Sequence, residues 1–158
     1  MDNTKPKPIK LTAEECCEQL LTDPALKQVM LGLLELLNEL KIKPSWYHGK
    51  SYKCNYKGGC ILFINFNEPN RLGIRVCAVN NYNELERFLE ALPDDLKAHY
   101  MEYLNTFERC CKSGSGCGMC QKRIKYYVTN PTMKQFETIK RLMFARMEFI
   151  KMLKGQKK

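Results

Sequence analysis

The feature that most constrains the fold is a set of three apolar segments in the middle of the chain, separated by short turn signals. In residues 51–57, tyrosine and cysteine alternate with lysine and asparagine, which is the period-two pattern of a strand. Residues 60–66 are apolar on both faces, as expected of a central strand, and residues 72–79 form a third apolar segment. Gly58-Gly59 and Glu68-Pro69-Asn70 are turn signals. Three successive strands joined by tight turns predict an antiparallel β-meander.

Two helices are expected before the meander. Thr12 and Glu15 fit a capping box, which predicts a short helix that begins just after Thr12. Asp23-Pro24 combines a helix-capping side chain with proline in the first turn, and the helix that follows reaches about Leu40.

The rest of the chain predicts four further elements and a cysteine loop. The elements are a helix from Asn83, a helix after Pro93, a strand over residues 123–129 and a final helix from Asn130-Pro131 to about Leu153. The fold class expected is α+β, an antiparallel meander sheet packed by helices on one face, with the cysteine loop before the last strand. The length of 158 residues suits one domain over residues 11–158, preceded by a flexible arm at residues 1–10.

The cysteine loop, residues 110–120, holds four of the nine cysteines. Two of them form a C-x2-C unit, a spacing that lets two thiolates bind one tetrahedral ion. The predicted zinc ligands are Cys110, Cys111, Cys117 and Cys120. Because adjacent cysteines do not easily bind one ion, His99, His48 or a strand cysteine is an alternative fourth ligand. The C-x2-C pair also fits a redox dithiol or, less well, an iron–sulfur cluster. The other cysteines of the sheet region, Cys54, Cys60 and Cys77, are interpreted as small buried hydrophobic residues.

We expect one zinc ion per chain, bound by Cys117 and Cys120 together with Cys110 or Cys111 and one further ligand. Removal of the ion should loosen the loop, because metal binding and local folding are coupled. Elemental analysis of protein purified without chelator would measure the stoichiometry. Zinc near zero with four reactive thiols would favour the redox alternative, and a brown protein would favour iron–sulfur.

The net charge of +9 is concentrated at the C-terminal end of the sequence. Residues 109–158 contain 13 Lys and Arg but only two acidic residues, whereas residues 1–108 contain 13 basic and 15 acidic residues. Such an excess attracts an anionic small molecule, an acidic protein or nucleic acid, or it is a solvated helix surface. The candidate anion-binding residues are Arg146, Lys122, Arg123, Lys125, Lys140 and Arg141.

Arg146 is unusual because it projects into the apolar stripe of the final helix. Leu142 and Ile150 lie four residues away on either side, and Met143 and Phe149 lie three away. An unpaired buried guanidinium is costly. We therefore expect Arg146 to be at least half buried and hydrogen-bonded to a carboxylate, to backbone carbonyls or to a bound anion.

Residues 46–56 concentrate the only tryptophan, three tyrosines and two lysines of this region. Such a segment stacks on bases or lines a pocket, or it simply packs at the start of a sheet. His48 is expected in a loop.

The sequence favours a binding module over an enzyme. It contains no nucleophile-elbow, zinc-protease, P-loop or dinucleotide-binding motif, and two histidines exclude a His-rich catalytic metal site. The leading interpretation is a zinc-containing module with an anionic ligand or partner. The alternatives are a thiol redox protein that uses the C-x2-C pair and a nucleic-acid-binding protein. No apolar run approaches a membrane span and no secretory signal is visible, so a cytoplasmic location without a membrane partner is expected.

Several short motifs of the chain resemble one known group of proteins. They are a Trp-Tyr segment that leads to Gly49-Lys50 and Tyr52, a Lys-Gly-Gly hairpin, the apolar strand at 60–66 and the helix after Asn130-Pro131. Over residues 25–154 the chain resembles small uncharacterised bacterial α+β proteins that carry a domain of unknown function. The resemblance implies the α+β fold, with the cysteine loop as an addition, and implies no catalytic residues.

Overall fold

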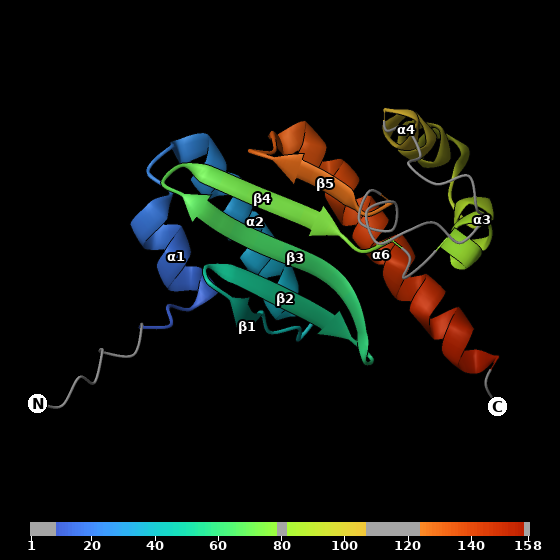
Figure 1. The fold of residues 1–158 in the computed structure, drawn as a ribbon, viewed down its shortest axis with the longest axis horizontal. Helices are drawn as coiled ribbons and strands as arrows, with labels where there is room; N and C mark the ends of the chain where they lie inside the picture. Colours follow the sequence, from blue (N-terminus) through green and yellow to red (C-terminus); the bar gives the residue numbers. More distant parts are fainter. Residues whose placement is uncertain (1–8, 79–81, 107–123, 157–158) are drawn as a thin grey trace, which may run out of the picture.

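The structure is a computed structural model that describes residues 9–78, 82–106 and 124–156. The elements follow the order α1 (Ala13–Leu20), α2 (Pro24–Glu39), β1 (Ser45–His48), β2 (Ser51–Tyr56), β3 (Gly59–Glu68), β4 (Arg71–Val76), α3 (Tyr82–Glu90), α4 (Asp94–Asn105), β5 (Tyr126–Thr129) and α6 (Met133–Gly155) (Figure 1). All strands belong to one antiparallel sheet whose spatial order is the sequence order, β1-β2-β3-β4-β5. The predicted α+β class and meander are therefore confirmed.

The strand β1 was not expected from the sequence. Ser45 pairs with Lys53 and Trp46 with Tyr52, and a register shift then separates Trp46 from His48. His48 thus lies at the end of an edge strand, and the expectation that it lies in a loop is wrong. Four residues with a bulge are too short to show period-two alternation.

The β2–β3 turn differs by one residue from its predicted place. Lys57 and Gly58 both have positive φ, 48° and 81°, as a two-residue hairpin turn that continues the strand twist requires. Gly59 is already the first residue of β3. A Cβ there would lie 2.8 Å from Cδ1 of Ile150, so the glycine lets α6 approach the sheet closely.

The helix starts follow their caps. Thr12 and Glu15 form the predicted capping box, and the Asp23 side chain accepts hydrogen bonds from the backbone N–H groups of Ala25 and Leu26. The predicted start of the last helix at Asn130-Pro131 is wrong, because Thr132 is the N-cap and forms a capping box with Gln135.

Two further boundaries also differ from the sequence expectation. Asn130 does not start α6: it has φ 50°, and its side chain accepts from the Leu72 backbone N–H, which ties the end of β5 to β4. α3 begins at Tyr82, so Asn83 lies inside its first turn rather than before it.

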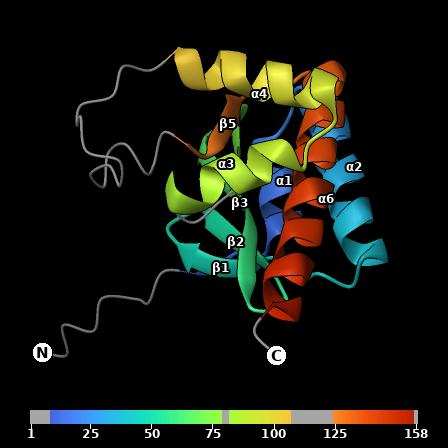
Figure 2. The same ribbon diagram turned by 90° about the vertical axis from the view of Figure 1, so that its right-hand side faces the viewer.

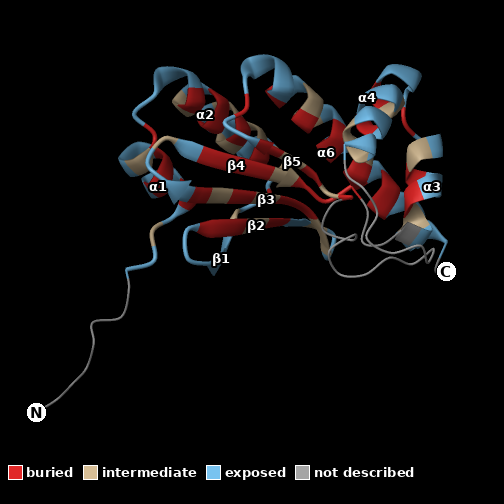
Figure 3. Cartoon of the chain, turned by 45° about the horizontal axis from the view of Figure 1, so that its top comes forward, coloured by how far each residue is buried: buried red, intermediate tan, exposed pale blue. Residues whose placement is uncertain are grey.

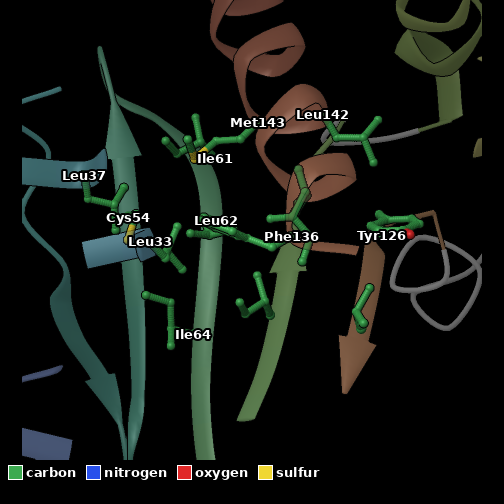
Figure 4. Close-up of a cluster of buried hydrophobic side chains, with 14 of the residues drawn as sticks. Leu33, Leu37, Cys54, Ile61, Leu62, Ile64, Tyr126, Phe136, Leu142 and Met143 are labelled. Carbon is green, nitrogen blue, oxygen red and sulfur yellow. The ribbon is translucent and has the colours of Figure 1, made fainter. Parts of the chain in front are cut away.

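The helices α1, α2 and α6 cover one face of the sheet, while α3 and α4 lie past its β5 side, where α4 packs against α6 (Figures 1 and 2). Figure 3 shows the buried residues concentrated on the strands and on the helix surfaces that face them. In Figure 4 Leu33 of α2 and Phe136 of α6 lie on either side of Leu62 of β3, and Met143 of α6 lies next to Ile61 of the same strand. This apolar layer is the core that positions the opposite face. Among the described helices, none has the length and apolar character needed to cross a membrane.

α4 also completes the hydrogen bonding of β5. The Tyr100 hydroxyl donates to the carbonyl of Ile124, just before the strand. The Tyr103 hydroxyl donates to the Lys125 carbonyl at 2.9 Å and accepts from the Tyr127 backbone N–H at 3.1 Å. The short edge strand is thereby held in place by tyrosine side chains of a helix.

Candidate functional site

The face of the sheet turned away from α1, α2 and α6 carries a row of alternating basic and aromatic side chains. Lys53 of β2 is opposite Phe63 of β3, which is opposite Arg75 of β4, which is opposite Tyr127 of β5. Because successive side chains of a strand point to opposite faces, the residues next to these four in sequence point to the helix side of the sheet. None of the described helices lies over the outer face (Figure 1), and all four side chains of the row are half-buried. We call the surface around this row the open face.

Phe63 lies at the centre of the open face. The Lys53 ammonium lies 6.0 Å and the Lys125 ammonium 5.6 Å from the centre of the phenyl ring. The Tyr47 ring approaches edge-on, with ring centres 5.4 Å apart, and is 54% exposed. β1, β2, β3 and the residue before β5 therefore bring two rings and two cations close together.

Tyr127 and Arg75 form a second aromatic–cation pair beside Phe63. The Arg75 guanidinium carbon lies 5.2 Å from the centre of the Tyr127 ring. A Cβ on Gly73 would lie 2.7 Å from the Tyr127 hydroxyl oxygen, so this ring lies across the Gly73 backbone. Glycine at this position is what allows the phenol ring to approach the sheet backbone this closely.

The charge of the open face is positive. The next row of the same face, Ser51, Asn65, Gly73 and Thr129, is uncharged. Among the described residues, no Asp or Glu forms an ion pair with Lys53, Arg75 or Lys125. Three cations near aromatic rings therefore give the described part of this face a positive charge, which attracts anions.

A pair of thiols lies at one end of the open face. The Sγ atoms of Cys60 in β3 and Cys77 after β4 are 3.3 Å apart. The hydrogen bond from the Cys77 thiol, together with Lys53 and Lys125, outweighs burial and lowers the pKa of Cys60 to about 7. The same hydrogen bond and burial raise the pKa of Cys77. The interpretation of Cys60 as a buried hydrophobic residue is wrong, since it is only partly buried and its thiol contacts that of Cys77, whereas Cys54 is fully buried.

Arg146 lies inside the molecule, on the helix side of the sheet. Its side chain is 1% exposed, and its Nε donates to the Cys60 carbonyl at 3.3 Å. Burial lowers the pKa of the guanidinium. The prediction that Arg146 is at least half buried and hydrogen-bonded is confirmed, and of the partners it named, a backbone carbonyl is present. Its role as an anion ligand stays a prediction.

The other candidate anion-binding residues fall into three places. Lys125 lies on the open face. Arg141 makes a two-pronged ion pair with Asp95 of α4, at 2.7 and 2.9 Å, and Lys140 pairs with Glu137 at 2.6 Å. Lys122 and Arg123 lie outside the described residues. Of the described candidates on the surface, Lys125 is thus the one whose charge no described carboxylate engages.

The predicted zinc ligands Cys110, Cys111, Cys117 and Cys120 lie outside the described residues, so the zinc loop stays a prediction. Within the described ranges, no three His, Cys, Asp or Glu side chains come together as a metal site. His99 Nε2 lies 3.0 Å from the Tyr126 hydroxyl, and the His48 ring stacks on Tyr47 with centres 5.4 Å apart.

Comparison of the chain with protein-family models, with curated proteins and with solved structures finds no match. The resemblance to small bacterial α+β proteins stays a prediction. The candidate site therefore has to be interpreted from its own chemistry.

Proposed function

We propose that this protein binds single-stranded nucleic acid on the open face of its sheet. Bases stack on Phe63 and Tyr127, and phosphates contact Lys53, Arg75 and Lys125. The observation that supports this proposal is the cross-strand row in which cations and rings alternate, one residue per strand.

The rings suit bases because each base has a π-face that stacks on an aromatic side chain regardless of sequence. Phe63 and Tyr127 are both half-buried, so their edges are fixed while part of each ring meets solvent. They lie two strands apart, about 10 Å across the sheet, since neighbouring strands are about 4.8 Å apart. Each ring therefore has room for its own base, and the exposed Tyr47 adds a third ring beside Phe63.

The cations suit a phosphate backbone because they are not engaged by described carboxylates. The ammonium groups of Lys53 and Lys125 rest near the Phe63 ring, and a phosphate can draw them away without breaking an ion pair. Three phosphate contacts to a single strand imply a slope of log affinity against log salt of about −2. Affinity should therefore fall roughly 15–20-fold between 50 and 200 mM salt.

The shape of the surface favours a single strand over a duplex. A five-stranded sheet is about 19 Å wide, whereas the major groove of B-DNA is about 12 Å wide and admits a helix or a two-stranded ribbon. Bases of a single strand are free to lie on a broad surface, as stacked bases in a duplex are not.

Fluorescence anisotropy with labelled oligo-uridine and oligo-thymidine strands measures this binding. Phe63→Leu removes one stacking ring and is expected to weaken binding about 5- to 150-fold, which corresponds to about 1–3 kcal/mol for one stacked base. Lys53→Gln is expected to weaken binding and to reduce the salt slope by about 0.7.

Lys134→Gln is the matched control, because it removes the same charge from the exposed surface of α6 on the opposite side of the sheet. We expect it to leave binding nearly unchanged. Equal losses for Lys53→Gln and Lys134→Gln would show that net charge alone drives association. A Phe63→Leu protein that binds as tightly as the original would contradict stacking on the open face.

A further inference from the structure

The β3–β4 hairpin brings two cysteines together that are 17 residues apart in sequence. Cys77 follows β4, and its backbone N–H donates to the Ile61 carbonyl at 3.0 Å. A register shift in the β2–β3 pairing occurs near Cys60, where Cys54 pairs with Leu62 but Asn55 pairs with Cys60. The two Sγ atoms lie 3.3 Å apart, and a disulfide of about 2.05 Å would require them to approach by roughly 1.3 Å.

The two thiols have different surroundings. Cys60 is partly exposed, and the positive charges of Lys53 from β2 and Lys125 before β5 lower the pKa of its thiol. Cys77 is 2% exposed and donates its proton toward Cys60. On the helix side, Arg146 of α6 binds the Cys60 carbonyl, and burial together with the nearby Cys60 raises the pKa of the Cys54 thiol. Cys60 is thus placed to react first, with Cys77 behind it as the second thiol.

We propose that Cys60 and Cys77 form a redox-active dithiol that exchanges with low-molecular-weight disulfides. The Cys60 thiolate attacks one sulfur of a disulfide RSSR, which forms a mixed disulfide and releases RS⁻. Cys77 then loses its proton to solvent, attacks the Cys60 sulfur and releases the second RS⁻. The two protein thiols lose two electrons, RSSR gains two, and two RSH molecules form. The reverse reaction restores the dithiol, and neither step depends on nucleic-acid binding.

The site differs from the C-x2-C pair of the sequence analysis, because it is built by strand pairing rather than by sequence spacing. Cys54, which neighbours the pair, gives an internal contrast. Burial raises the pKa of its thiol to about 12 and its side chain is 0% exposed, so it should not react in the folded protein.

Peptide mapping of the full-length protein tests the proposal directly. The protein is incubated with oxidised glutathione, its free thiols are alkylated, and it is digested with trypsin. Cleavage after Lys and Arg places Cys60 alone in peptide 58–71, Cys77 alone in peptide 76–87 and Cys54 alone in peptide 54–57. We expect a disulfide between peptides 58–71 and 76–87 that excess reduced glutathione removes, with peptide 54–57 alkylated only after unfolding. Absence of this cross-link under excess oxidised glutathione would overturn the proposal. The experiment uses the original protein and so does not depend on the folding of a variant.

Two variants test the order of reaction. Cys77→Ser is expected to stop at a glutathione adduct on peptide 58–71, and Cys60→Ser is expected to leave peptide 76–87 without an adduct. Because the thiolate is the attacking form, the rate at which iodoacetamide alkylates Cys60 in the original protein, followed on peptide 58–71, should reach half its maximum near pH 7. Adduct formation on Cys77 in the Cys60→Ser protein, or a rate still rising above pH 9, would overturn the assignment of Cys60 as the first nucleophile.

Discussion

Replacement of Arg146 by alanine is expected to lower the free energy of unfolding by about 2–4 kcal/mol. The guanidinium is 1% exposed and donates to the Cys60 carbonyl, so the substitution removes a charged hydrogen bond worth about 1.5–3 kcal/mol. It also leaves a cavity between α6 and β3 and an acceptor without its donor. Urea unfolding followed by circular dichroism measures the change.

Arg146→Met separates packing from hydrogen bonding. Methionine replaces the apolar stem of arginine but donates no hydrogen bond, so we expect a loss between zero and that of the alanine variant. Equal stability of the alanine variant and the original protein would contradict a structural role for the buried guanidinium.

A second large effect is expected at Leu62, whose neighbour Phe63 gives the contrast. Leu62 is 0% exposed and points toward the helices (Figure 4), whereas Phe63 is half-buried on the open face. Leu62→Ala should cost about 2–5 kcal/mol, because it opens a cavity in the apolar layer. Phe63→Leu should cost less than about 1.5 kcal/mol, because leucine keeps most of the apolar contact.

Thermal and urea unfolding of the two variants measure this difference between the faces. If Phe63→Leu destabilised the protein as much as Leu62→Ala, the phenyl ring would be a core side chain. The weaker binding expected of Phe63→Leu would then have to be ascribed to unfolding. The stability measurement therefore also decides how the binding assay is interpreted.

The sequence predicts the elements whose signal is local. The meander follows from period-two segments and turn residues, and the capping box of Thr12 and Glu15 predicts α1 correctly. Burial of Arg146 follows from its apolar neighbours at helical spacing. One error falls where two local signals compete: Asn130-Pro131 resembles a helix start, but the capping box of Thr132 and Gln135 two residues later is stronger.

The candidate site could not be predicted from the local sequence, because its residues come from different strands. Lys53, Phe63 and Arg75 look unrelated along the chain and become neighbours only through the register of β2, β3 and β4. The charge count pointed instead to the C-terminal third, where Arg141 and Lys140 are in fact engaged by Asp95 and Glu137. Strand alternation could have predicted the face on which these residues lie. Alternate residues of one strand share a face, so Lys53 and Phe63 are assigned to the outer face once the buried residues are known.

The contact between α4 and β5 determines how this sheet meets other molecules. An exposed edge strand offers unpaired N–H and C=O groups to which a second chain adds, which is a common route to aggregation. Here Tyr103 occupies the Tyr127 N–H and the Lys125 C=O, so an incoming strand would first have to displace a helix. At the opposite edge, β1 is four residues long and interrupted by a register shift. Growth of the sheet by strand addition is thus hindered at both edges, and its broad outer surface is left as the place where a long, extended ligand can lie.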